Sequence, residues 1–170
     1  MPKSRLPSLA ASLAPLAMRV PGDADAAFLA RLYASTRMDL HSATADPAFV
    51  ASLVAMQQRL QAADYRRRFP GADYLLLERA GAACGRIVLD TGPSALRLVD
   101  IALLPEARGR RLGRHIVRAL QRCAADACLP LTLSVHHANP GARRLYATLG
   151  FRCTARDDVS EQMMWNNEPP

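Results

Sequence analysis

A run rich in arginine and glycine is the part of this sequence with the clearest capacity for binding chemistry. Arg108-Gly109-Arg110-Arg111-Leu112-Gly113 follows the apolar run Leu98–Leu104 and precedes a helical pattern from Arg114 to Ala127. A strand, a glycine-bearing turn and a helix in this order can hold a diphosphate. Glycines let backbone N–H groups approach the oxygens, and the helix N-terminus adds partial positive charge. The arginines add full charges, so the run predicts a phosphate cradle.

A second informative segment, Asn139 to Phe151, combines a helix start with a tyrosine. Asn139-Pro140 places a capping side chain before a proline at the first helical position, and Gly150 ends the helical pattern. Tyr146 lies at the end of the second turn of this predicted helix. Tyr146 could either pack its ring against the helix face or present its hydroxyl to a ligand.

One acidic residue, Asp100, lies inside the apolar run. A carboxylate among apolar neighbours is costly unless it has a partner, and Arg86 or Arg97 could supply one. The face of a strand on which a residue lies changes at a bulge, and the sequence does not locate bulges. A structural ion pair and a role as a base therefore both stay open for Asp100.

Composition narrows the classes of function. A net charge of +7 on 170 residues favours anionic partners, such as nucleic acid or a phosphorylated cofactor. Aromatic residues make up only 5% of the chain and do not interleave with a basic stretch, which argues against binding of single-stranded nucleic acid. A basic domain that binds duplex DNA is the other possibility, but the arginines cluster at the cradle and form no groove-length stripe, so we expect no nucleic-acid partner. No window approaches the roughly 20 apolar residues that cross a bilayer, so we expect no membrane association.

The cysteines argue against a metal centre. Cys84, Cys123, Cys128 and Cys153 form no C-x-x-C pattern. Most of them fall in predicted helices or strands, where free buried thiols are more common than metal ligands. We therefore expect no metal site, no disulfide and a cytoplasmic location.

Hydrophobic periodicity predicts alternating strands and helices. Expected strands lie near Met18–Val20, Tyr74–Leu77, Arg86–Leu89, Leu96–Leu104, Leu131–Val135, after Phe151 and at Gln162–Trp165. Expected helices run over Ala24–Ser35, from Asp46-Pro47 towards Phe69, over Arg114–Ala127 and from Asn139 to Gly150. The second of these helices has its apolar positions at Phe49, Leu53, Met56 and Leu60. The pattern predicts a mixed sheet flanked by helices on both faces.

The chain is expected to form a single domain over residues 18–168. The segment Met1–Ala17 is small, rich in Ser, Ala and Pro, and interrupted by Pro7 and Pro15. We expect this segment to be a loose N-terminal extension, because the prolines argue against a secretory signal.

The two motifs together resemble the GCN5-related N-acetyltransferases. Leu98–Gly113 is similar to the family's acyl-CoA-binding segment, with its signature [Q/R]-x-x-G-x-[G/A] after a strand that ends in proline. Asn139–Phe151 is similar to the family's next segment, N-x-x-A-x-x-L-Y-x-x-x-G-F. The resemblance covers roughly Tyr74 to Trp165. It implies an α/β (α+β) fold: a mixed, mostly antiparallel sheet of about seven strands with a splayed parallel pair.

The resemblance also implies acetyl-CoA as co-substrate and assigns residues to it. A bulge would separate two parallel strands so that the pantetheine arm lies between them. Expected contacts come from the backbone of Ile101, Ala102 and Leu103, from the cradle residues Arg108, Gly109, Arg110, Arg111, Leu112, Gly113 and Arg114, and from Asn139 and Tyr146. Asn139 could instead act only as a helix cap.

One cradle position departs from the family pattern. Arg111 occupies the place where the family usually has glycine. An arginine there could serve if its φ is negative and its side chain leans away, or if the side chain folds over to meet a phosphate.

The resemblance implies a catalytic acid and leaves the base less defined. Tyr146 would lie near the CoA sulfur, where a phenol can donate a proton to the departing thiolate. Asp100 is the first candidate for the base that removes a proton from the amine, and Glu106, His136 and His137 are alternatives.

The implied reaction is direct transfer of an acetyl group from acetyl-CoA to a primary amine, of a small molecule or a peptide, within a ternary complex. The acceptor is expected in a cleft lined by Arg37–Ala45 and Gln57–Arg68. A non-catalytic acyl-CoA-binding sensor or assembly module on the same fold is the alternative. The final strands in such folds can pair between subunits, which is compatible with a homodimer.

Overall fold

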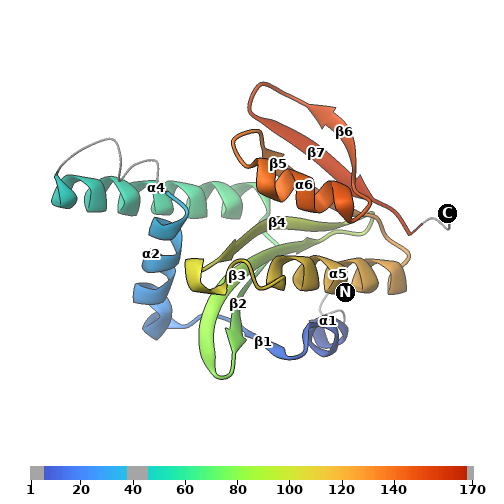
Figure 1. Ribbon diagram of the computed structural model, residues 1–170, viewed down its shortest axis with the longest axis horizontal. Helices are drawn as coiled ribbons and strands as arrows, with labels where there is room; N and C mark the ends of the chain where they lie inside the picture. Colours follow the sequence, from blue (N-terminus) through green and yellow to red (C-terminus); the bar gives the residue numbers. More distant parts are fainter. Residues whose placement is uncertain (1–5, 38–45, 168–170) are drawn as a thin grey trace.

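A seven-stranded mixed sheet forms the centre of the structure. The computed structural model describes residues 6–37 and 46–167. The strands are β1 (Leu16–Arg19), β2 (Asp73–Arg79), β3 (Ala82–Thr91), β4 (Leu96–Leu103), β5 (Leu131–His136), β6 (Arg152–Arg156) and β7 (Ser160–Trp165). They are arranged in the order β1-β2-β3-β4-β5-β7-β6, and only β4 and β5 run parallel (Figure 1). The expected mixed, mostly antiparallel sheet with one parallel pair is confirmed.

Helices lie on both faces of this sheet. They are α1 (Leu6–Leu13), α2 (Ala26–Ser35), α4 (Pro47–Arg68), α5 (Leu112–Asp126) and α6 (Pro140–Thr148), with short 3₁₀ turns at Asp23–Asp25 and Pro105–Ala107. Both predicted Asx-Pro helix starts are confirmed. Asp46 accepts a hydrogen bond from the Ala48 N–H at 2.9 Å, and Asn139 accepts one from the Ala142 N–H at 3.1 Å.

The main apolar core joins one face of the sheet to α5 and α1. Ile116, Val117 and Leu120 of α5 are fully buried against sheet leucines such as Leu89 and Leu98. A smaller cluster lies between α2 and α4 and consists of Tyr33, Val50 and Val54. The two clusters leave a polar layer between α4 and the second face of the sheet, and this layer contains the site described below.

The N-terminal segment is not the loose extension that its composition suggests. Residues 6–13 form α1, and Leu9 and Leu13 are 2% and 0% exposed in the main core. The carbonyls of Ser12 and Leu13 also bond the side chains of Arg122 and His115, each at 2.9 Å. The prediction failed because Leu9 and Leu13, one helical turn apart, share the face of α1 that packs on the core, and a composition rich in Ser, Ala and Pro does not reveal this face. Residues 1–5 lie outside the described chain.

The apolar stripe predicted for α4 also does not face the core. Phe49, Met56 and Leu60 are 58%, 45% and 61% exposed, whereas Val50 and Val54 are buried. Both sets have helical spacing, so periodicity predicts the helix but cannot choose its inner face. In Figure 1 α4 extends beyond the sheet and α2, which leaves this stripe facing solvent. Within the described residues, no helix is long and apolar enough to cross a membrane.

Replacing Leu13 by alanine tests whether α1 is structural. Leu13→Ala removes a fully buried side chain and is expected to lower the free energy of unfolding by about 2–5 kcal/mol, measured by urea titration. Ala10→Ser, on the exposed side of the same helix, is the matched control and should change stability by less than about 0.5 kcal/mol. Equal, small effects of both substitutions would contradict the burial of α1.

Candidate active site

A β-bulge in β4 opens the sheet at its centre. Leu89 of β3 is opposite Leu98, but the neighbouring Val88 is opposite Asp100, so Val99 is the extra residue. The bulge reverses the alternation of side chains: Leu98 faces the main core, and Asp100 faces the other side, towards α4. The pairing of β4 with β5 ends at Leu98 and Leu133, and the two parallel strands separate beyond that point.

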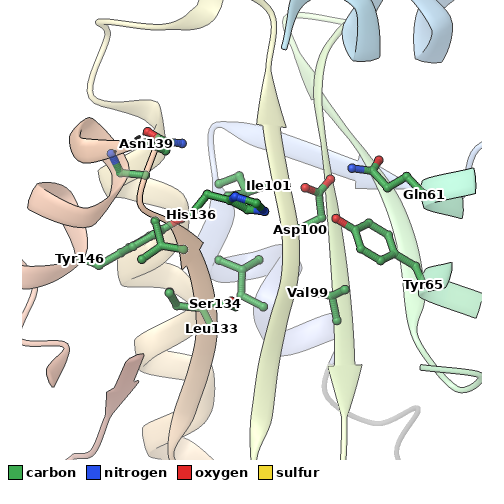
Figure 2. Close-up of a pocket in the computed structure, with 13 residues that line it drawn as sticks. Gln61, Tyr65, Val99, Asp100, Ile101, Leu133, Ser134, His136, Asn139 and Tyr146 are labelled. Atoms are coloured by element: carbon green, nitrogen blue, oxygen red, sulfur yellow. Dashed lines mark hydrogen bonds between the residues drawn. The ribbon is translucent and has the colours of Figure 1, made fainter. Parts of the chain in front are cut away.

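The gap between the separated strands is a cavity of about 250 Å³. Its lining residues come from β4, β5, α4 and α6, and Figure 2 shows Asp100, Tyr65, His136, Asn139 and Tyr146 around it. A second cavity of about 190 Å³ adjoins it and is walled by α2, α4, β3 and β4. The two cavities share Gln61, Asp100, Ile101 and Asn139, so a ligand entering at one can meet groups of the other.

Asp100 forms a mostly buried ion pair with Arg86. Arg86 and Asp100 point to the same face of the sheet, and Arg86 Nη2 lies 2.5 Å from Asp100 Oδ2. Their side chains are 13% and 19% exposed, and Arg86 also reaches Gln61 Oε1 at 3.5 Å. Arg97, the other partner considered for Asp100, bonds Gln162 instead. The structure therefore has Asp100 both paired and lining the two cavities.

Tyr146 approaches the first cavity from the side opposite Asp100. It lies on α6, is 6% exposed, and its ring packs at a tilt on Phe151 with centroids 5.7 Å apart. Burial, together with the negative charge of Asp100, raises the pKa of Tyr146 to about 12. Tyr146 therefore keeps its proton throughout the physiological pH range.

Two residues of α4, Gln61 and Tyr65, form the wall beside Asp100. Figure 2 shows both side chains directed from α4 towards Asp100. Burial and the charge of Asp100 raise the pKa of the Tyr65 phenol well above its usual value. The sequence analysis predicted a cleft along Gln57–Arg68 without singling these residues out. The sequence signal that could have identified Gln61 and Tyr65 is their helical spacing from Val50 and Val54, which places all four on one face of α4.

The structure places the remaining candidates for the base, and the other predicted cleft segment, in different surroundings. His136 lines the first cavity, whereas Glu106 is exposed in the 3₁₀ turn and lines neither cavity. His137 is turned away and its Nε2 lies 2.8 Å from the Asp157 carbonyl. Arg37, at the start of the other predicted cleft segment, contacts Gln57. The rest of that segment, residues 38–45, lies outside the described residues.

The turn that begins α5 exposes its backbone donors. Gly109 has a φ of +71°, and Arg111 is the N-cap of α5 with φ +59° and ψ +11°. Among the described residues, no backbone N–H from Gly109 to Arg114 has a protein acceptor. The first way in which an arginine could serve at this position required a negative φ. The positive φ of Arg111 shows that this expectation is wrong. The left-handed backbone that the family's usual glycine would favour is present here in an arginine.

The cradle arginines have two different roles in the structure. The guanidinium of Arg108 donates to the Leu103 carbonyl at 2.9 Å and to Ser35 at the end of α2, which fixes the turn against α2 (Figure 1). Arg114 donates to the Thr148 hydroxyl of α6 at 3.1 Å. Arg110 and Arg111 are exposed, and their side chains make no hydrogen bond or ion pair with the described part of the protein. The charges available to a ligand are thus fewer than the sequence suggests.

Comparison with solved structures gives many proteins of the same fold. A PaiA N-acetyltransferase from Thermoplasma acidophilum in complex with coenzyme A superposes with a TM-score of 0.64 over 89% of this chain and 98% of its own, at 16% identity. An acetyltransferase from Thermus thermophilus gives 0.62 over 89% and 96%, at 21% identity. A GNAT family acetyltransferase from Elizabethkingia anophelis with acetyl-CoA bound gives 0.53 over 61% and 82%, at 13% identity.

Sequence comparison assigns the family independently of the fold. No curated protein matches the chain significantly. The sequence pattern of the acetyltransferase (GNAT) family, however, matches residues 37–151, which is more than half of the chain and includes the bulged strand, the cradle and α6. The chain belongs to the GNAT family of acetyltransferases.

Proposed function

We propose that this protein transfers the acetyl group of acetyl-CoA directly to a primary amine. The observation that carries the proposal is the run of backbone N–H groups from Gly109 to Arg114 that have no acceptor among residues 6–37 and 46–167. This run follows the end of β4 that has separated from β5. Buried or clustered backbone donors without a partner call for an anionic ligand or water. Coenzyme A and acetyl-CoA are the molecules bound in two of the related structures.

The cradle and the gap suit the two ends of that co-substrate. Gly109 has open space where a Cβ would be, so oxygens can approach its backbone closely. In the part of the chain that the structure describes, the β5-facing edge of β4 from Val99 to Leu103 has no strand partner, so its backbone groups can hydrogen-bond an extended amide-bearing arm. The carbonyl of Leu103 is already bonded by Arg108, which leaves the backbone of Ile101 and Ala102 as the principal contacts.

Bound acetyl-CoA would supply the thioester, and the chain supplies the donors and acceptors around it. With a pKa of about 12, Tyr146 is a weak acid beside a thiol of ordinary pKa about 8.5. Complete proton transfer to that thiolate is uphill by about 5 kcal/mol. Tyr146 therefore acts as a hydrogen-bond donor to the charge that develops on the leaving sulfur, and keeps its own proton.

Asp100 occupies the position suited to the amine. The Arg86 guanidinium holds the carboxylate in place, and Gln61 and Tyr65 surround it on the α4 side. A carboxylate there accepts hydrogen bonds from an incoming ammonium and takes its proton, directly or through water, before nitrogen attacks the thioester carbon. His136, which lines the same cavity, is the second candidate for this role.

Direct transfer is favoured over a covalent enzyme intermediate. None of Cys84, Cys123, Cys128 or Cys153 lines either cavity, so no thiol is placed to receive the acetyl group. Attack by the amine, loss of its proton to Asp100 and departure of coenzyme A then take place in one ternary complex. Catalysis arises mainly from positioning the reactants.

An acceptor screen tests the proposed activity. Purified protein, acetyl-CoA and a panel of amines (diamines, amino acids, aminoglycosides and peptides with free N-termini) are assayed for release of free coenzyme A. We expect amine-dependent release for at least one class. Thermal stabilisation by coenzyme A without turnover on any amine would contradict the transfer reaction and indicate a binding module.

Tyr146→Phe tests the hydrogen bond to the leaving sulfur. The ring still packs on Phe151, so affinity for acetyl-CoA should stay within about twofold, while kcat falls about 10²-fold. Tyr74→Phe is the matched control, because the Tyr74 hydroxyl is buried without a partner in the described structure and lines neither cavity. Unchanged kcat for Tyr146→Phe would remove this residue from the mechanism.

Gly113→Glu tests the cradle. A Cβ at Gly113 would meet Leu145 at 3.5 Å, an ordinary contact, so Gly113→Ala should fold and bind coenzyme A. The carboxylate of Gly113→Glu adds negative charge at the helix N-terminus and is expected to abolish binding in calorimetry. Binding by the Glu variant at wild-type affinity would show that the diphosphate does not lie at this turn.

Asp100→Asn distinguishes the two candidates for the base. We expect kcat to fall about 10²- to 10⁴-fold in this variant and to change little in His136→Ala, with Tm recorded for both to detect unfolding. The opposite ranking of the two variants would assign the proton transfer to His136.

A further inference from the structure

The second cavity is lined by one positive and one negative side chain. Among the described residues around it, only Arg86 and Asp100 carry a formal charge, and the others are apolar or neutral and polar. Asp100 also lines the first cavity, whereas Arg86 lines the second alone. A carboxylate by itself would favour any cationic amine. A carboxylate beside a guanidinium favours a ligand that carries both signs of charge in the complementary order.

Arg86 has hydrogen-bond donors that the described protein does not use. Its Nη2 donates to Asp100 Oδ2 at 2.5 Å and reaches Gln61 Oε1 at 3.5 Å. Its Nε is buried without a partner, and its Nη1 has no hydrogen bond within residues 6–37 and 46–167. A guanidinium has five N–H donors, and buried charged groups are stable only when they are paired. Since Nε is shielded, a ligand in the cavity would reach this side chain through Nη1.

The closeness of the two charges sets the spacing of the charges on the ligand. The bonded atoms of Arg86 and Asp100 lie 2.5 Å apart, so the ammonium and the anionic group that face them must also be near neighbours. One carbon between the two groups, as in an α-amino acid, gives such a spacing. Carboxylate and phosphate both match the donors of a guanidinium, and a small cavity favours the smaller carboxylate.

The cavity also limits the size of the ligand. Its volume of about 190 Å³ is below the roughly 300–1,000 Å³ of pockets that hold drug-sized molecules. Its wall on the α2 side includes Leu32 and Tyr33, which are buried and fixed by packing. These dimensions favour a small free molecule over a long polyamine.

We propose that the acceptor is a small free α-amino acid, whose ammonium faces Asp100 while its carboxylate accepts hydrogen bonds from Arg86. The inference rests on the proposed function, because it names the amine that receives the acetyl group. It gives Arg86 a direct role in recognition of the substrate, in addition to holding Asp100 in place.

The reaction on such a substrate balances without a further reactant. One ammonium proton passes to Asp100, the freed nitrogen lone pair bonds the acetyl carbon, and the carbon–sulfur bond breaks with its electron pair on sulfur. The nitrogen then loses a second proton and becomes a neutral amide, while the thiolate of coenzyme A takes up a proton from solvent as it leaves. The product keeps only its carboxylate, which lies near Asp100 without the compensating ammonium. This repulsion favours release of the N-acetyl amino acid.

Matched substrate pairs test the role of the carboxylate. Leucine is compared with 3-methylbutylamine, which lacks only the carboxylate, and phenylalanine is compared with 2-phenylethylamine. We expect kcat/KM, measured by release of free coenzyme A, to be about 10- to 100-fold higher for each amino acid than for its counterpart. Leucinamide, in which the carboxylate is replaced by a neutral amide, should resemble the amine. Leucinamide used as well as leucine would assign the site to peptide N-termini and contradict the proposal.

Arg86→Gln separates recognition of the carboxylate from placement of Asp100. Any displacement of Asp100 lowers kcat/KM for leucine and for 3-methylbutylamine alike, so it cancels in the ratio of the two values. We expect this ratio to fall about 10-fold or more in Arg86→Gln and less in Arg86→Lys, which keeps the charge. Arg97→Gln is the matched control, because Arg97 also bonds a glutamine but lines neither cavity, and its ratio should not change. The Tm of each variant shows whether it folds, and Arg86→Lys serves if Arg86→Gln does not.

The possible failures separate this inference from the proposed function. If Arg86→Gln, or Arg86→Lys in its place, lowers kcat/KM equally for leucine and 3-methylbutylamine, Arg86 only positions Asp100 and the inference is wrong. If the wild-type protein acetylates other amines but no amino acid, the inference also fails while acetyl transfer stands. If no amine supports release of coenzyme A, both the inference and the proposed function fail.

Discussion

The single extra residue at Val99 is the constraint on which the rest of the site depends. In a regular strand, Leu98 and Asp100 would share a face, and the carboxylate would lie in the apolar core beside α5. The bulge turns Asp100 to the opposite face, where Arg86 pairs with it and α4 covers it. The same irregularity coincides with the end of the pairing between β4 and β5, so a charged group and an open gap appear at one level of the sheet.

The two faces of the sheet have different roles: one packs the main apolar core, and the other carries the candidate site. One face, with α5 and α1, holds most of the fully buried side chains, which fix the position of α5. The other face carries the polar layer of Tyr65, Gln61, Arg86 and Asp100, beside fewer buried apolar side chains such as Leu76 and Val88. A rigid core on one side thus positions donors and acceptors that the other side leaves accessible.

Local signals in the sequence predict much of this structure. Cap-proline pairs locate the starts of α4 and α6, and the glycine-arginine run locates the turn before α5, because each feature depends on residues within a few positions of one another. The cradle's free backbone donors follow from the same local pattern. The resemblance to a known family extends this to the bulge, the parallel pair and the tyrosine of α6.

What the sequence does not predict depends on contacts between distant segments. Arg108 is held by Ser35, far away in the chain, so its side chain braces the turn although the motif suggests a phosphate contact. The inner face of α4 and the burial of α1 are likewise decided by which surfaces meet in three dimensions. The left-handed backbone of Arg111 could not be foreseen from propensity, because this conformation is unfavourable for a residue with a Cβ.

A crystal structure with coenzyme A bound tests the central claim most directly. The account predicts diphosphate oxygens about 3 Å from the backbone nitrogens between Gly109 and Arg114, and the thiol in the gap beyond Leu98 and Leu133. Coenzyme A seated elsewhere on the protein, with these nitrogens still facing solvent, would contradict the account.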